Sequence, residues 1–184
     1  YGDHRDLHSF LHDALPILWS ELDCLVIDMP PGTGDAQLSL AQAVPVTAGV
    51  TVTTPQMVSL DDSRRSLDMF KKLNIPIAGI VENMSGFIAP DTGVEYDIFG
   101  KGTTQPMADE FDTKIIAEVP IEPAVREGGD QGKPVTFAQP DSETAKRFMG
   151  AAEALWAKIE KINEEGGDRK EHTSELQSRG HLVC

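Results

Sequence analysis

The stretch LDCLVIDMPPGTGDAQLSLAQ, residues 22–42, decides the fold class. Its first eight residues form a nearly continuous apolar run, which is typical of a strand buried on both faces of a parallel sheet. A glycine-containing turn follows, and residues 36–43 then have the composition of a short helix with Asp35 as its N-cap. A strand, a tight loop and a helix in this order predict an α/β fold.

The rest of the chain continues this alternation. Strands are predicted over residues 48–54, 75–81 and 115–119, and the last of these is expected to end at Pro120. Residues 85–102 are rich in Gly, Pro and Asp, so they are predicted to be a long loop that contains at most a short hairpin through residues 96–99.

Three more helices are predicted between and after these strands. The first covers residues 59–73 with Ser59 as its cap, the second runs from near Thr104 to Phe111, and the third covers residues 142–163 with a cap at Asp141 or Ser142. Alternating strands and helices imply right-handed crossovers, so we predict one doubly wound, mainly parallel sheet.

Composition limits the classes of partner. The net charge of −14 and the pI of about 4.6 argue against a surface for nucleic acid or anionic membrane, because both need clustered Lys and Arg. No apolar stretch approaches the roughly 20 residues of a membrane span. Two cysteines cannot form a disulfide framework, so a cytoplasmic location is expected.

Both ends of the chain read differently from its middle. LHDALPI at residues 11–17 and EHTSELQS at residues 171–178 resemble translated sequencing-adapter DNA rather than evolved protein. Residues 1–17 and 167–184 are therefore interpreted as non-native tails around a domain of residues 18–166. All five histidines fall in the tails, so neither His-dependent catalysis nor a His/Cys zinc site is expected in the domain.

The carboxyl ends of parallel strands meet at one edge, where α/β folds bind ligands. That edge is expected to gather residues 28–35, 53–56, 82–85 and 120–126. Asp28 suits a Walker-B-type acid that holds Mg²⁺ on a nucleotide, directly or through water. A helix cap or a structural ion pair is the alternative, and strand plus acid alone do not choose between them.

Five ordered segments closely resemble the Mrp/NBP35 family of P-loop ATPases, which are relatives of MinD and ParA and act as iron–sulfur cluster carriers. The resemblance runs from about Trp19 to Asn163. The segments are LDCLVIDMPPGTGDAQLSLAQ (22–42), VTTPQMVSLDDSRRSLDMF (52–70), PIAGIVENMS (76–85), YDIFG (96–100) and EVPIEPAVREGGDQGKPV (118–135).

This resemblance implies ATP and Mg²⁺ as cofactors. Asp28 matches the family's Mg²⁺-associated acid, expected to act through water, and DMPPGTGD matches the switch II loop that senses the γ-phosphate, with Pro31, Gly32 and Gly34 in contact with nucleotide. Asn83 matches the asparagine that contacts adenine; without the family it is an ordinary turn residue. Pro120 matches the other side of the base, with a plain strand-to-helix connection as the alternative.

Two departures from the family pattern matter. The family's P-loop and its lysines belong N-terminal to the matching part of this chain, so we interpret the chain as an N-terminally truncated ATPase and expect no ATP hydrolysis by it alone. Family members carry Cys-Pro-x-Cys, through which two subunits ligate a bridging [4Fe–4S] cluster. Here Ala89 and Thr92 occupy the cysteine positions, and Cys24 in the first strand is no substitute.

The leading hypothesis is therefore the C-terminal part of an ATP-binding iron–sulfur cluster carrier that couples ATP binding and hydrolysis to cluster delivery. The resemblance implies a homodimer and recipient iron–sulfur apoproteins as partners, with no nucleic acid and no membrane. A MinD/ParA-like ATPase fragment without cluster function and an inactive truncated module are the alternatives.

Overall fold

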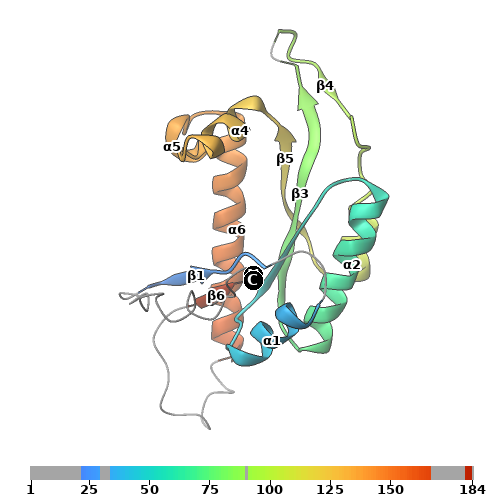
Figure 1. Cartoon of the computed structure of the whole chain (residues 1–184), viewed down its shortest axis with the longest axis vertical. Coiled ribbons are helices and arrows are strands. Elements are labelled where there is room, and N and C mark those ends of the chain that lie inside the picture. The colour runs from blue at the N-terminus through green and yellow to red at the C-terminus, as the bar shows by residue number, and fades with distance from the viewer. Residues whose placement is uncertain (1–21, 30–33, 90, 167–180, 184) are drawn as a thin grey trace, which may run out of the picture.

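The computed structural model describes residues 22–29, 34–89, 91–166 and 181–183 (Figure 1). The predicted alternation of strands and helices is confirmed. The elements are β1 (Cys24–Val26), α1 (Asp35–Ala43), β2 (Gly49–Thr53), α2 (Met57–Lys72), β3 (Ile77–Ile88), β4 (Glu95–Tyr96), α3 (Gln105–Glu110), β5 (Ile115–Ile121), α4 (Pro123–Asp130), α5 (Val135–Ala138), α6 (Glu143–Gly166) and β6 (His181–Val183).

A four-stranded sheet organises the structure. Strands β2 and β5 pair in parallel with β3, one on each side, and β4 pairs antiparallel with the distal end of β3. Helix α2 lies against β2 and β3, whereas α6 packs on β5 and β3 from the other side (Figure 1). The predicted α/β fold with helices on both faces is confirmed, and the described sheet is mixed and partly parallel.

The main core lies between α2, the sheet and α3. Leu60, Leu67 and Phe70 project from one face of α2, and Leu60 and Leu67 are fully buried. Ile80 of β3 and Met107 of α3 complete this cluster, each also fully buried. Helical spacing of the α2 residues produces this apolar stripe, so burial of the stripe fixes α2 on the sheet.

The prediction of a loop over residues 85–102 is wrong for residues 85–88, which belong to β3. Strand β3 continues to Ile88 and turns back into β4, with Phe87 opposite Tyr96 and Ile88 opposite Glu95. Apolar and aromatic side chains favour such cross-strand pairs, and this pairing outweighs the Gly and Pro content that predicted a loop. The resulting hairpin projects beyond the rest of the sheet (Figure 1).

The prediction that the first strand is buried on both faces is also wrong. Strand β1 has three residues, pairs in parallel only with β6 among the described strands, and leaves the Val26 side chain 71% exposed. An apolar run becomes buried on both faces only when neighbouring strands and helices cover it. The structure instead places β1 in a two-stranded ribbon, separate from the four-stranded sheet.

The helix termini confirm one predicted cap and correct another. Ser142 is confirmed as a cap of α6, because its hydroxyl accepts a 3.1 Å hydrogen bond from the Ala145 amide. Helix α1 begins at Asp35, but Gly34 is its N-cap, so the prediction for Asp35 is wrong by one position. Helices α4 and α5 were not predicted, although proline is common in the first turn of a helix and Pro123 begins α4.

None of the described helices is both long enough and apolar enough to cross a membrane.

Candidate nucleotide site at the carboxyl edge of the sheet

The carboxyl end of β2 lies level with the middle of β3, where β5 pairs with the other side of β3. Thr53 lies opposite Glu82, Glu82 lies opposite Glu118, and Asn83 lies opposite Val119. Three of the four segments predicted to converge are therefore neighbours. The fourth, which contains Asp28, follows β1 and lies outside this sheet.

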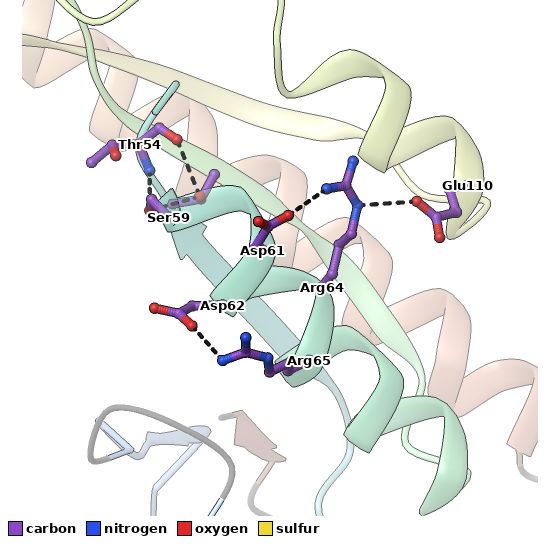
Figure 2. Close-up of polar contacts among 8 residues, drawn as sticks. Thr54, Ser59, Asp61, Asp62, Arg64, Arg65 and Glu110 are labelled. Atoms are coloured by element: carbon purple, nitrogen blue, oxygen red, sulfur yellow. Dashed lines mark hydrogen bonds and ion pairs between the residues drawn. The ribbon is translucent and has the colours of Figure 1, made fainter. Parts of the chain in front are cut away.

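The segment that links β2 to α2 is held by hydroxyl groups. The Ser59 hydroxyl accepts a 3.0 Å hydrogen bond from the Thr54 amide and lies 3.1 Å from the Thr53 hydroxyl (Figure 2). The Thr103 hydroxyl donates to the Pro55 carbonyl at 2.6 Å. Helix α2 begins at Met57, so the prediction of Ser59 as N-cap is wrong; this serine fixes the preceding loop instead.

A second polar network joins helices α2 and α3. Arg64 of α2 reaches Asp61 on its own helix at 3.1 Å and Glu110 of α3 at 3.2 Å (Figure 2). Both carboxylates are more than half exposed, so these pairs orient α3 beside α2 but contribute little to stability.

Glu82 is a buried acid that the sequence reading missed. Its side chain is 3% exposed, with Thr104 beside it at the start of α3. Burial raises the pKa of Glu82 above its ordinary value, the nearby Thr104 hydroxyl lowers the pKa, and the Glu118 carboxylate raises it again. The sequence signal that could have identified this buried acid is a carboxyl group inside an otherwise apolar strand.

Replacing Glu82 by Gln is expected to stabilise the fold at pH 7, by on the order of 1 kcal/mol, because it removes a desolvated charge. Folding raises the pKa of Glu82, so the folded state favours the protonated carboxyl group. The stability contributed by this protonated group is present in acid and is lost as the pH rises through the folded-state pKa. The gain should therefore shrink as the pH falls. Urea unfolding at several pH values measures it.

Glu153→Gln, which removes one carboxylate from an exposed position of α6, is the matched control. It should change stability by less than about 0.5 kcal/mol at every pH. A gain from Glu82→Gln that stays the same at acid and neutral pH would contradict the role of burial.

Asn83 has an unusual setting. Its side chain is half-buried, and its Oδ1 accepts a 2.9 Å hydrogen bond from the Met84 amide. Met84 itself has a φ of 57°, in the left-handed region, although it lies within β3. Because a backbone N–H can only donate, this contact fixes which end of the amide is oxygen. The Nδ2 group is left as a donor for other partners.

Pro120 lies beside Asn83. It is buried and follows Val119, the residue opposite Asn83, so the structure brings these two predicted site residues together. The prediction that β5 ends at Pro120 is wrong, because pairing resumes between Ile121 and Phe87. Their assigned contacts with a base stay predictions.

Two of the predicted phosphate and metal residues, Asp28 and Gly34, are described, and both belong to segments outside the four-stranded sheet. Asp28 is exposed and follows β1, which pairs with β6 and not with the four-stranded sheet. Gly34 is exposed at the start of α1. Pro31 and Gly32 lie outside the described residues. Asp28 as a Mg²⁺ acid stays a prediction.

The described residues do not by themselves fit a metal ion. In residues 22–29, 34–89, 91–166 and 181–183, no three His, Cys, Asp or Glu side chains are grouped so that they could hold one. The described edge thus brings the half-buried Asn83 amide near the buried Pro120, and its described residues include no group of three carboxylates that could hold Mg²⁺.

The hairpin tip carries the positions of the expected cluster cysteines. Ala89 is 8% exposed, and its carbonyl accepts a 2.8 Å hydrogen bond from the Gly93 amide. Thr92 is exposed, with its hydroxyl 3.4 Å from the Val94 amide. Neither side chain can supply a thiolate. The half-buried Cys24 lies in β1, and burial raises the pKa of its thiol, which disfavours the thiolate.

Comparison with known proteins shows the family of the chain. The family model of the NUBPL iron-transfer P-loop NTPases matches residues 4–156. The iron–sulfur cluster carrier protein of Helicobacter pylori is 56% identical over 161 residues, covering 88% of this chain and 43% of the relative. The iron–sulfur cluster transfer protein NUBPL of Mus musculus is 42% identical over 134 residues, covering 73% and 42%.

Solved structures show the same fold. A nucleotide-binding protein from Archaeoglobus fulgidus in complex with ADP has a TM-score of 0.59 and 32% identity, covering 68% of this chain and 51% of that chain. The cell division ATPase MinD of Pyrococcus furiosus has a TM-score of 0.53 and 25% identity, covering 71% and 50%.

This chain spans less than half the length of the curated relatives described above. The boundaries of residues 18–166 as the domain stay a prediction. The resemblance to Mrp-type carriers is confirmed, because the family model covers most of the sequence. By this match the chain belongs to the NUBPL iron-transfer P-loop NTPases, as a partial-length homologue of the iron–sulfur cluster carrier proteins.

Proposed function

We propose that this chain is the C-terminal part of an ATP-binding iron–sulfur cluster carrier with a lost or altered cluster site, and that it contributes the adenine-binding half of the nucleotide site. The observation that carries the proposal is the pairing of Asn83 of β3 with Val119 of β5, the residue before Pro120, next to the end of β2. Family membership and the ADP complex of the Archaeoglobus fulgidus relative support an adenine nucleotide as the ligand.

Asn83 would read the base and Pro120 would support it. The free Nδ2 group of Asn83 donates to a ring nitrogen of adenine, while Oδ1 has a second lone pair for the exocyclic amine. Because Pro120 is buried, it would support the base indirectly, by fixing the β5 backbone beside Asn83. ATP supplies the energy of the conformational cycle when it is bound; residues outside those gathered here must hold its phosphates and Mg²⁺.

Carriage of the cluster is the less supported half of the proposal. In the family-type arrangement, a homodimer in the cytoplasm would hold the cluster as cargo and pass it to recipient apoproteins. The side chains of Ala89 and Thr92 favour a second candidate function, a MinD/ParA-like ATPase fragment without cluster cargo. Cluster reconstitution, discussed below, distinguishes the two.

Replacing Asn83 by Ala is expected to weaken adenosine binding about tenfold, because one or two hydrogen bonds to the base are lost. Adenosine is the probe because it needs no phosphate-binding residues. Chemical-shift titration of the ¹⁵N-labelled 184-residue chain measures the affinity and reports on the Asn83 side-chain amide directly.

Asn163→Ala, near the opposite end of α6 from the carboxyl edge, is the control and should leave the titration unchanged. Adenosine that shifts no signal near Asn83 or Pro120 at any concentration would refute the adenine site.

A further inference from the structure

Met84 holds a backbone conformation that a methionine seldom adopts. Its φ of 57° lies in the left-handed region, where a side chain with a Cβ costs roughly 1–2 kcal/mol. Its side chain is 41% exposed, so packing of the side chain does not account for the conformation. Some feature of the surrounding backbone must impose it.

The partner strand supplies that feature. Between the pairs Asn83–Val119 and Phe87–Ile121, three residues of β3 (Met84, Ser85 and Gly86) face the single residue Pro120. Proline has no N–H to donate, and in sheets it is confined to edges, strand starts and bulges. Strand β5 pairs only with β3 among the described strands, so Pro120 lies on an edge strand and opposite a bulge.

The bulge is further held from the other side by β4. A Cβ added to Gly86 would lie 3.0 Å from the Glu95 carboxylate, so the backbone there passes close to the hairpin. Ser85 is buried. The three residues that face Pro120 are accommodated within β3, and the left-handed backbone conformation lies at the first of them, Met84.

The left-handed turn at Met84 acts on Asn83. It directs the Met84 N–H onto Asn83 Oδ1 at 2.9 Å, at the point where the regular pairing of β3 with β5 is interrupted. The side-chain amide of Asn83 is thereby held in one orientation, with Nδ2 pointing away from the Met84 amide.

We infer that Met84 is a positioning residue for purine recognition: its backbone, bent by the bulge opposite Pro120, locks the Asn83 amide in the orientation that distinguishes adenine from 6-oxopurines. This role rests on the proposed adenine site. A 6-oxopurine presents N1–H and a carbonyl where adenine presents N1 and an amine, so an amide of fixed orientation matches only one of them.

The test compares residues that accept the left-handed conformation with one that does not. Met84→Asn and Met84→Gly should keep the preference for adenosine over inosine, whereas the β-branched Met84→Val should reduce it about tenfold. Met84→Ala removes the side chain with little change in backbone preference relative to Met, and should keep it. Loss of the preference in Met84→Ala and Met84→Gly would overturn the inference, because it would assign the role to the side chain.

Hydrogen exchange of the Met84 amide tests the lock without any ligand. Exchange should be slow in the native chain and about tenfold faster in Asn83→Ala, which removes the acceptor. Equal exchange in both would overturn the inference even if Met84→Val fails to fold. If the Met84 amide is protected but no variant binds adenosine, the proposed function fails, and with it the role in recognition.

Discussion

Replacing both Ala89 and Thr92 by cysteine is expected to turn a chain that takes up no cluster into one that does. The two positions are three residues apart at the hairpin tip, a spacing typical of paired thiolate ligands. Thr92 is exposed, and the tip projects from the sheet, so two copies could bring four thiolates together (Figure 1). Anaerobic reconstitution with iron and sulfide, followed by absorbance and by iron content per chain, measures the gain.

The native chain and the two single-cysteine variants are the controls, and each should retain no cluster. Adding Cys24→Ala to the double variant should leave the uptake unchanged, because Cys24 lies in β1 and not on the hairpin. Stoichiometric cluster in the native chain would show that other residues ligate it, and would remove the argument for a non-carrier function. No cluster in the double variant would exclude the hairpin tip as the cluster site.

Replacing Leu60 by Ala is expected to lower the free energy of unfolding by about 2–5 kcal/mol. Leu60 is fully buried, and it packs among residues of α2, β3 and α3 that form one cluster. Truncation leaves a cavity where three elements meet, so neighbours can fill it only by moving a helix. Thermal and urea unfolding measure the loss.

Val58→Ala is a matched control on the same helix. Val58 is 76% exposed and lies two residues before Leu60. Its replacement should change stability by less than about 0.5 kcal/mol. Similar losses in the two variants would mean that α2 does not pack on the sheet through the face described above.

The order and type of most elements could be predicted from local sequence. The buried face of α2 follows from the spacing of Leu60, Leu67 and Phe70, and the strand β2 follows from its β-branched residues. These signals act within one element. The two short helices α4 and α5 were not predicted, because α4 includes Gly128 and Gly129, which disfavour a helix interior, and α5 is only four residues long.

The candidate site was predicted in part. The ENMS motif placed Asn83 at the carboxyl edge, and the structure brings Pro120 beside it. Glu82 was missed because its significance depends on burial, which neighbouring strands and α3 create. Asp28 was expected at the same edge, but strand pairing decides that position, and β1 pairs elsewhere.

The sequence by itself determined the family, the α/β class and the residues available for chemistry, including the lack of cysteine at positions 89 and 92. Those properties follow from residue types and their spacing along the chain. The tertiary structure alone decided the bulge opposite Pro120, the left-handed turn at Met84 and the orientation of Asn83. A register shift depends on which strands pair, and residues almost forty positions apart set that pairing, so no local pattern encodes it.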